Sequence, residues 1–221
     1  MIYITGDTHA EYEGFLNRIY RYPVTAEDIV IVCGDFGFVW DHADERVALE
    51  KLKKEPFTIA FVDGNHEDFN YLADFPAEEW NGGRIHRISD NIVHLMRGQC
   101  FVIGGKRFFT MGGAYSIDRP MRIEGFSWFP QEIPDDADYQ TAAETLGRCG
   151  YEVDYVLTHT VPQSVIHYLG IVPDHHDAEL TGYLQWLYEH LKFTMWFAGH
   201  FHVNRLVRGN VQLLFDEVVT L

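Results

Sequence analysis

Five short segments of the chain carry aspartate, asparagine and histidine side chains in patterns typical of metal binding. They are Gly-Asp-Thr-His at 6–9, Gly-Asp-Phe at 34–36, Gly-Asn-His-Glu at 64–67, Thr-His-Thr at 158–160 and Gly-His-Phe-His at 199–202. Asp7 and His9 are two positions apart, so in extended chain both side chains point to one side and can hold one ion. His200 and His202 repeat this spacing. Asp35 has two carboxylate oxygens, with which it can bridge two ions.

Such a set of ligands would support hydrolysis at phosphorus. Two divalent ions roughly 3.5–4 Å apart bind phosphoryl oxygens and activate a bridging water for in-line attack, without a covalent enzyme intermediate. Nitrogen and oxygen ligands without thiolate suit manganese, iron or zinc better than calcium or copper(I). The candidate ligands are Asp7, His9, Asp35, Asn65, His159, His200 and His202.

An apolar run with the character of a β-strand precedes each of the five segments. These runs cover residues 1–4, 29–32, 57–62, 155–157 and 195–197. A strand that stops at such a segment directs the following side chains out of the sheet edge, which is where open α/β sheets bind ligands. We therefore expect five ligand-bearing loops to converge on one rim.

The remaining pattern predicts further helices and strands. Helical spacing of apolar residues occurs at 11–20, 44–54, 135–149 and 178–191. Short alternating strands are expected at 92–95, 100–103 and 107–111, paired antiparallel with a hairpin turn at 104–106, and two more at 205–207 and 211–215. The stretch 114–134 lacks clean periodicity, and long ordered loops of this kind are commonly functional.

Length and charge limit the class of protein. At 221 residues with 47% hydrophobic content, the chain can bury one substantial core, so residues 1–221 are expected to form a single domain. Its formal charge of −16 has the wrong sign for a protein that holds a long nucleic acid by its phosphates.

Cysteine usage and hydropathy predict a cytoplasmic protein. Cys33, Cys100 and Cys149 are far apart and form no paired motif, which indicates reduced thiols rather than a disulfide framework. No run approaches 18 apolar residues, so no membrane association is expected. The first predicted strand begins at Met1 and leads directly to Asp7, so no cleaved leader is expected either.

The five segments, in their order and spacing from Gly6 to His202, resemble those of the calcineurin-like metallophosphoesterases. The resemblance implies an α/β fold, a four-layer α-β-β-α sandwich of two mixed sheets flanked by helices. It also implies two divalent ions, with manganese as the first expectation and iron or zinc as alternatives.

The resemblance also implies a role for each matching residue. One metal ion would be bound by Asp7, His9 and His202, the other by Asn65, His159 and His200, and Asp35 would bridge them. His66 would protonate the leaving alkoxide or stabilise the phosphoryl charge, a contribution typically worth 10²–10⁴ in rate. Glu67 would be a structural neighbour rather than a reactant.

The chain departs from the Ser/Thr phosphoprotein phosphatases, which carry arginines directly after the second motif and directly before the third. Here Phe36 and Asp63 occupy the corresponding regions. Substitute cations could come from Arg119 or Arg122, because an arginine fork matches phosphate oxygens, although a structurally paired arginine is as common. Trp40, shortly after the bridging aspartate, is a candidate to line the substrate pocket.

Three functions are compatible with these residues. The first, which we rank above the others, is a phosphomonoesterase that acts on a small phosphate ester or on a phosphoprotein. The second is a phosphodiesterase that acts on nucleotides or cyclic nucleotides. The third is a non-catalytic scaffold, which the retention of every ligand and of His66 disfavours. A second histidine cluster, His175 and His176 between two aspartates, could bind adventitious metal, but the acidic first turn of a helix explains the aspartates more simply.

Overall fold

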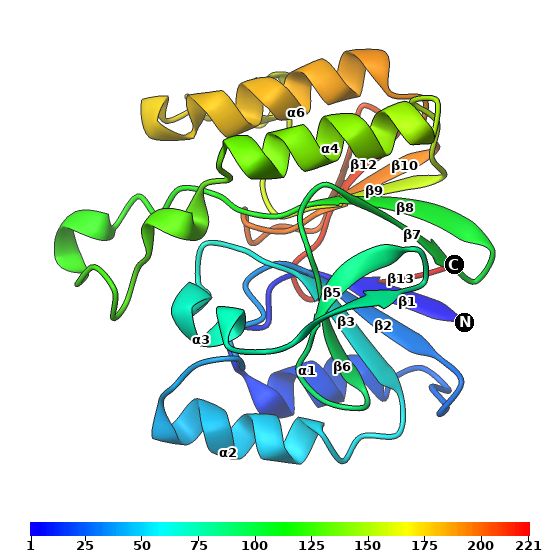
Figure 1. Cartoon of the computed structure of the whole chain (residues 1–221), viewed down its shortest axis with the longest axis vertical. Coiled ribbons are helices and arrows are strands. Elements are labelled where there is room, and N and C mark those ends of the chain that lie inside the picture. The colour runs from blue at the N-terminus through cyan, green and yellow to red at the C-terminus, as the bar shows by residue number, and fades with distance from the viewer.

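Two mixed β-sheets form the centre of the computed structural model, which describes residues 1–221 (Figure 1). The first sheet has seven strands, and its four central strands, β1, β2, β3 and β6, run parallel. In spatial order its strands are β13 (Val218–Thr220), β1 (Ile2–Thr5), β2 (Ile29–Cys33), β3 (Thr58–Val62), β6 (Ile92–Leu95), β5 (Gly83–Arg87) and β4 (Ala77–Trp80).

The second sheet has six strands, with a parallel centre and an antiparallel strand at each edge. In spatial order its strands are β11 (Arg205–Val207), β12 (Val211–Leu213), β10 (Met195–Ala198), β9 (Tyr155–Thr158), β8 (Lys106–Met111) and β7 (Gln99–Ile103).

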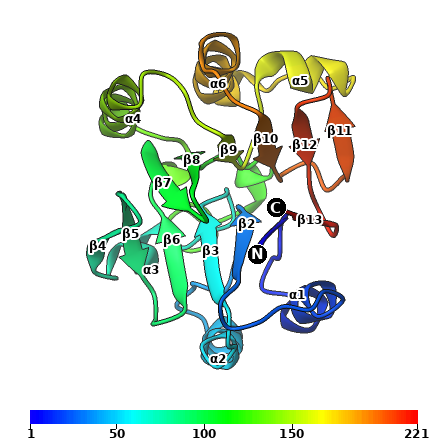
Figure 2. The same ribbon diagram turned by 90° about the vertical axis from the view of Figure 1, so that its right-hand side faces the viewer.

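Helices cover the outer face of each sheet (Figure 2). On the first sheet these are α1 (Tyr12–Ile19) and α2 (Ala43–Leu52), and on the second α4 (Asp136–Arg148), α5 (Gln163–Tyr168) and α6 (Ala178–His190). The short α3 (Phe69–Ala73) follows β3. Three-residue 3-10 helices are η1 (Arg119–Met121), η2 (Pro130–Glu132) and η3 (His175–Asp177). The predicted α-β-β-α sandwich is confirmed.

Three buried apolar clusters hold the layers together, and strand β2 shows why. Val30 and Val32 belong to the cluster under α1 and α2, whereas Ile31 and Cys33 belong to the cluster between the two sheets. Successive residues of a strand point to opposite faces, so a strand buried on both faces needs a continuous apolar run. The third cluster packs α4, α5 and α6 onto the second sheet.

Most expected elements lie within two residues of their predicted bounds. The antiparallel hairpin of β7 and β8 is confirmed. The predicted antiparallel pairing of β6 with β7 is wrong, because the two strands lie in different sheets. Strand β6 instead joins the first sheet parallel to β3, since its Ile92, Val93 and Leu95 are buried on both faces. The β4–β5 hairpin, β13, α3 and α5 were not expected.

None of the helices is both long enough and apolar enough to span a bilayer. All three cysteines are free thiols, with Cys33 buried in the cluster between the sheets.

Candidate metal centre

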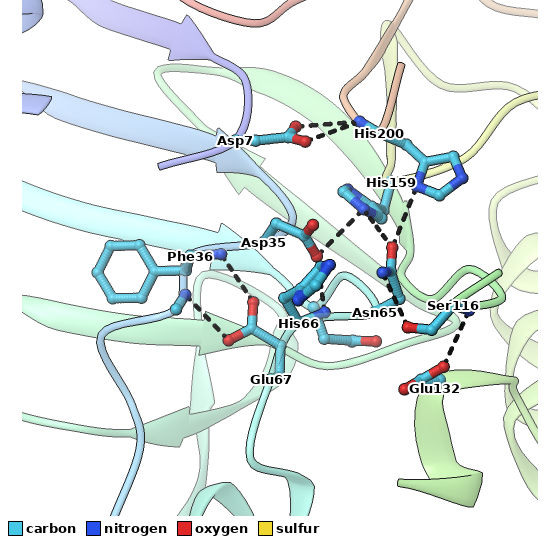
Figure 3. Close-up of polar contacts among 12 residues, drawn as sticks. Asp7, Asp35, Phe36, Asn65, His66, Glu67, Ser116, Glu132, His159 and His200 are labelled. Atoms are coloured by element: carbon cyan, nitrogen blue, oxygen red, sulfur yellow. Dashed lines mark hydrogen bonds and ion pairs between the residues drawn. The ribbon is translucent and has the colours of Figure 1, made fainter. Parts of the chain in front are cut away.

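The structure brings all seven predicted ligands together at one end of the two sheets, as the strand pattern predicts. Strands β1, β2 and β3 of the first sheet and β9 and β10 of the second each lead into one of the five loops. Figure 3 shows Asp35, Asn65, His159 and His200, which come from four of these loops, with Asn65 in contact with both histidines.

A first group consists of Asp7, His9 and His202. The Nε2 atom of His202 lies 3.0 Å from Asp7 Oδ2 and 3.0 Å from Nε2 of His9. His9 Nε2 is 3.7 Å from the same carboxylate oxygen. The three side chains therefore direct a carboxylate oxygen and two imidazole nitrogens at one point, a donor set that suits a divalent cation.

A second group consists of Asn65, His159 and His200. The Oδ1 atom of Asn65 is 3.1 Å from His159 Nε2 and 3.1 Å from His200 Nδ1. The convergence of two imidazole nitrogens and one amide oxygen gives a second donor set of the same kind.

Asp35 lies between the two groups and turns one carboxylate oxygen toward each. Its Oδ2 is 3.8 Å from His9 Nδ1, and its Oδ1 is 3.2 Å from His159 Nε2. Oδ1 also accepts a hydrogen bond of 2.8 Å from the backbone amide of His66. This geometry matches a carboxylate that bridges two ions.

The charges of the centre fit bound cations. Asp7 and Asp35 are 1% and 2% exposed, and their ion-pair partners are all histidines. Burial alone would lower the pKa of His159, but the neighbouring Asp35 carboxylate raises it, to about 10. Burial would raise the pKa of Asp35, but the facing histidines hold it below its usual range. Two buried carboxylates without lysine or arginine thus create a demand for positive charge that divalent ions would meet.

Neighbouring groups orient the second set of donors. The Nδ1–H group of His159 donates to the carbonyl of Cys33 at 2.9 Å, which leaves Nε2 free as a ligand atom. The amide nitrogen of Asn65 donates to Ser116 Oγ at 3.0 Å and so turns Oδ1 to the centre (Figure 3). The Ser116 amide in turn donates to Glu132 at 3.1 Å.

Four of the seven candidate ligands have left-handed backbone conformations. His9, Asp35, His200 and His202 have φ values of 46°, 48°, 68° and 49°. Such conformations are costly for non-glycine residues and concentrate at functional sites. Close approach of the loops also requires glycine: a Cβ at Gly64 would lie 2.0 Å from Asp35 Oδ1, and one at Gly199 would lie 2.1 Å from Asp7 Oδ1.

His66 lies beside the centre and contacts an arginine from the 114–134 segment. The Nη1 and Nη2 atoms of Arg122 lie 3.0 Å from Nδ1 and Nε2 of His66. Burial lowers the pKa of His66, and the charge of Arg122 lowers it further. The indole nitrogen of Trp40 donates to the His66 carbonyl at 3.4 Å, and all three residues border a cavity of about 280 Å³.

Arg119 has a different environment. Its guanidinium forms a 3.1 Å ion pair with the buried Glu132 and lies between the rings of Tyr115 and Trp128. Since Glu132 also holds Ser116, Arg119 contacts the network that orients Asn65 rather than the centre itself.

Sequence reasoning missed several residues that support the centre. Buried Glu67, expected to be a structural neighbour, accepts hydrogen bonds from the amides of Phe36 and Gly37, which ties the Asp35 loop to the Asn65 loop. Asp63 pairs with Arg97 at 2.5 Å directly before the third motif. Ser116 and Glu132 carry no motif signal, because only the tertiary fold places them next to Asn65.

A cavity of about 510 Å³ opens beside the centre. Asp35, Asn65, His66, His200 and His202 form its inner end. The side chains farther out include Asp118, Asp174 and Asp177 but no lysine or arginine. The volume lies in the range of ligand pockets of ordinary enzymes.

Two lariat debranching enzymes are similar in sequence to this chain. Lariat debranching enzyme from Homo sapiens is 25% identical over 237 residues, which is 90% of this chain and 41% of that protein. The enzyme of the same name from Gallus gallus is 25% identical over 206 residues, which is 80% of this chain and 37% of that protein. The chain thus spans about two fifths of the length of these relatives.

A crystal structure of phosphopantetheinyl hydrolase from Mycobacterium tuberculosis superposes with a TM-score of 0.47 and 16% identity, over 97% of this chain and 89% of that one. The family model described as calcineurin-like phosphoesterase matches residues 1–204. The chain therefore belongs to the calcineurin-like phosphoesterases, metal-dependent hydrolases of phosphate esters that use a binuclear centre of divalent ions.

Proposed function

We propose that this phosphoesterase cleaves phosphodiesters that carry a small organic group. The observation that carries the proposal is the 510 Å³ cavity beside the candidate centre, which has three outer carboxylates and no lysine or arginine. The sequence alone favours a phosphomonoesterase over a phosphodiesterase. The charges of this cavity lead us to propose the phosphodiesterase instead.

The charge of the substrate is the physical reason. A phosphate monoester has its second pKa near 6 and is close to a dianion at neutral pH, whereas a diester carries a single negative charge. Asp174 and Asp177 repel the more highly charged ester more strongly, whereas the charge of Asp118 is offset by its 2.8 Å ion pair with Arg122. Two relatives are named debranching enzymes, which also supports cleavage of a diester.

We assign the two metal ions to the two groups of donors. Asp7, His9 and His202 would hold one, Asn65, His159 and His200 the other, and Asp35 would contact both. When bound, the ions supply Lewis acidity toward phosphoryl oxygens and lower the pKa of bound water. Manganese is the metal we propose first, with iron or zinc as alternatives, because the donors are nitrogen and oxygen atoms only.

His66 and Arg122 are proposed to act on the phosphoryl group and the leaving oxygen. Burial and the Arg122 charge lower the pKa of His66, so its imidazole is neutral near pH 7 and donates one hydrogen bond. This favours stabilisation of phosphoryl charge over protonation by an imidazolium. Arg122 adds a fixed positive charge at the same place, and Trp40 holds the His66 backbone.

A phosphomonoesterase, acting on a small ester or a phosphoprotein, remains the second candidate. The observation in its favour is Arg122, whose guanidinium lies next to His66 and could pair with an extra negative charge on phosphate.

We also propose that residues 1–221 form one domain, because the cluster between the sheets contains residues from both ends of the chain, among them Ile4 and Leu214. The cytoplasmic location expected from the cysteines stays a prediction.

The test is hydrolysis of bis-p-nitrophenyl phosphate beside p-nitrophenyl phosphate, with metal-stripped protein refilled with Mn²⁺. We expect metal-dependent turnover with a higher kcat/KM for the diester. The Asp35→Ala variant should lose both activities. A higher kcat/KM for the monoester would move the phosphatase to first place.

A further inference from the structure

The cavity beside the metal centre contains a buried carboxylate that the proposed mechanism does not use. Asp177 directly precedes helix α6 and is 6% exposed. Its Oδ1 atom has no hydrogen-bond partner, although buried polar atoms are nearly always paired. The residue lines the 510 Å³ cavity, and a rotation of its carboxylate would present the buried, unpaired oxygen to a molecule bound there.

The rest of the cavity wall suits a flat, largely apolar group. Its apolar side chains are Ile166, Ile171, Val172, Pro173 and Phe201. The ring of Tyr115, another lining residue, is already covered by His176, at a centroid distance of 4.5 Å, and by the Arg119 guanidinium at 4.3 Å, so the apolar side chains form the wall that is open to a ligand. Aromatic and apolar walls with a few polar groups are the usual surroundings of a bound heterocycle.

We propose that this cavity is the subsite for the organic group of the diester, and that Asp177 accepts a hydrogen bond from the N–H edge of a nucleobase such as guanine. The inference rests on the proposed diesterase function and specifies its substrate class.

The chemistry of an ionised carboxylate selects the base. It accepts hydrogen bonds and cannot donate one. Guanine presents two adjacent N–H donors, whereas thymine and uracil present one N–H between two carbonyl oxygens that a carboxylate repels. Asp174 adds negative charge to the same cavity, which disfavours an acceptor-rich edge further.

The energetics of Asp177 agree with a role in binding. Burial raises its pKa to about 6, so the ionised carboxylate costs stability at neutral pH. A group that destabilises the free fold is common at binding sites, where function and stability conflict.

The experiment compares the p-nitrophenyl phosphodiesters of guanosine and thymidine, each esterified at its 5′-phosphate, with the Mn²⁺-loaded protein. We expect a kcat/KM about 10-fold or more higher for the guanosine ester, since a hydrogen bond to a charged group is worth roughly 1.5–3 kcal/mol. Asp177→Asn should reduce this preference to about 2-fold or less. Asparagine has nearly the same shape and precedes helices equally well, so the variant should fold.

Glu179→Gln is the matched control, because Glu179 is exposed in the first turn of the same helix and lies outside the cavity lining. It should keep the full preference for guanosine. A preference retained by Asp177→Asn, or equal kcat/KM values in the wild type, would overturn the inference. So would faster cleavage of p-nitrophenyl phosphorylcholine, whose choline group is cationic and has no N–H donor, because the cavity would then select positive charge.

Bis-p-nitrophenyl phosphate separates this inference from the proposed function. If the wild type hydrolyses it but cleaves the guanosine and thymidine esters equally well, the proposed diesterase function is supported and the proposed subsite is refuted. If the wild type does not hydrolyse it, the diesterase proposal fails, and saturation-transfer NMR with guanosine and thymidine alone decides the subsite. Guanosine signals that Asp177→Asn abolishes would support the subsite, and equal signals from both nucleosides would refute it.

Discussion

The guanidinium of Arg122 lies against the imidazole of His66, with two nitrogen–nitrogen distances of 3.0 Å. Arg122 is held there by a 2.8 Å ion pair with Asp118 and a 3.0 Å hydrogen bond to the carbonyl of Ser127. The irregular 114–134 segment thereby delivers a positive charge to the third ligand loop.

Replacing Arg122 with glutamine should lower kcat/KM roughly 10²-fold, the order expected when a donor to a transition-state anion is lost. It should also move the acidic limb of the pH–rate profile to higher pH, because the Arg122 charge helps to lower the pKa of His66. Steady-state kinetics from pH 5 to 9 would show both effects. Arg84→Gln, an exposed position on β5, is the control. Unchanged kinetics for the Arg122 variant would remove it from the site.

His66→Ala should lower turnover by roughly 10²–10⁴ while leaving the bound metal near wild-type levels. The reason is that His66 contacts Arg122 and the edge of the centre but belongs to neither group of donors. Elemental analysis after dialysis, together with kcat, tests both parts. The exposed His167→Ala should change neither quantity. Loss of metal by the His66 variant would assign it a ligand role instead.

Asp177→Asn should make stability less sensitive to pH. The folded-state pKa of Asp177, about 6, lies above the ordinary value of 3.8, so the folded form binds the proton more tightly. Its unfavourable charge therefore appears as pH rises from about 4 through 6, and the variant should be more stable than wild type above that range, by up to ~3 kcal/mol.

Urea unfolding at pH 4, 6 and 8 measures this difference. The gap between variant and wild type should widen toward pH 8. A gap that is constant with pH would mean that Asp177 is not a buried, destabilised carboxylate.

Arg97→Met should destabilise the fold by about 3–5 kcal/mol, because it leaves the Asp63 charge buried without its guanidinium partner. Asp63 is 1% exposed and also contacts His94 at 3.1 Å. The double variant Asp63→Asn, Arg97→Met should recover part of the loss, since position 63 then carries no charge, and the remaining loss includes the Arg97–Asp138 ion pair. Denaturant unfolding of the single and double variants tests this coupling, and additive losses would argue against it.

The ligand loops were predictable from sequence because each is a local pattern: an apolar strand, a small residue and then a donor. The position of Asp35 between the two groups of candidate ligands and the clustering of all seven candidates follow from parallel strands that end at one edge. The same logic predicted the α-β-β-α layers through runs such as 29–32, which are apolar at every position.

Other features depend on contacts that sequence spacing does not encode. Strand β6 joins β3 rather than β7 because the chain crosses between sheets around Gly98, a choice made by packing. The sequence does not distinguish Arg119 from Arg122 as a substrate contact. In the structure Arg119 forms an ion pair with Glu132, whereas Arg122 contacts His66. The sequence predicts that Asp177 belongs to the acidic first turn of a helix. Its burial in the cavity wall depends on tertiary contacts that the sequence pattern does not reveal.

The most direct test of the binuclear assignment is a crystal of the protein loaded with Mn²⁺ and measured at the manganese absorption edge. We expect two anomalous peaks, one within ligand distance of Asp7, His9 and His202, and the other near Asn65, His159 and His200. Asp35 should lie between them and contact both. A single peak, or peaks that lie away from Asp35, would contradict the assignment.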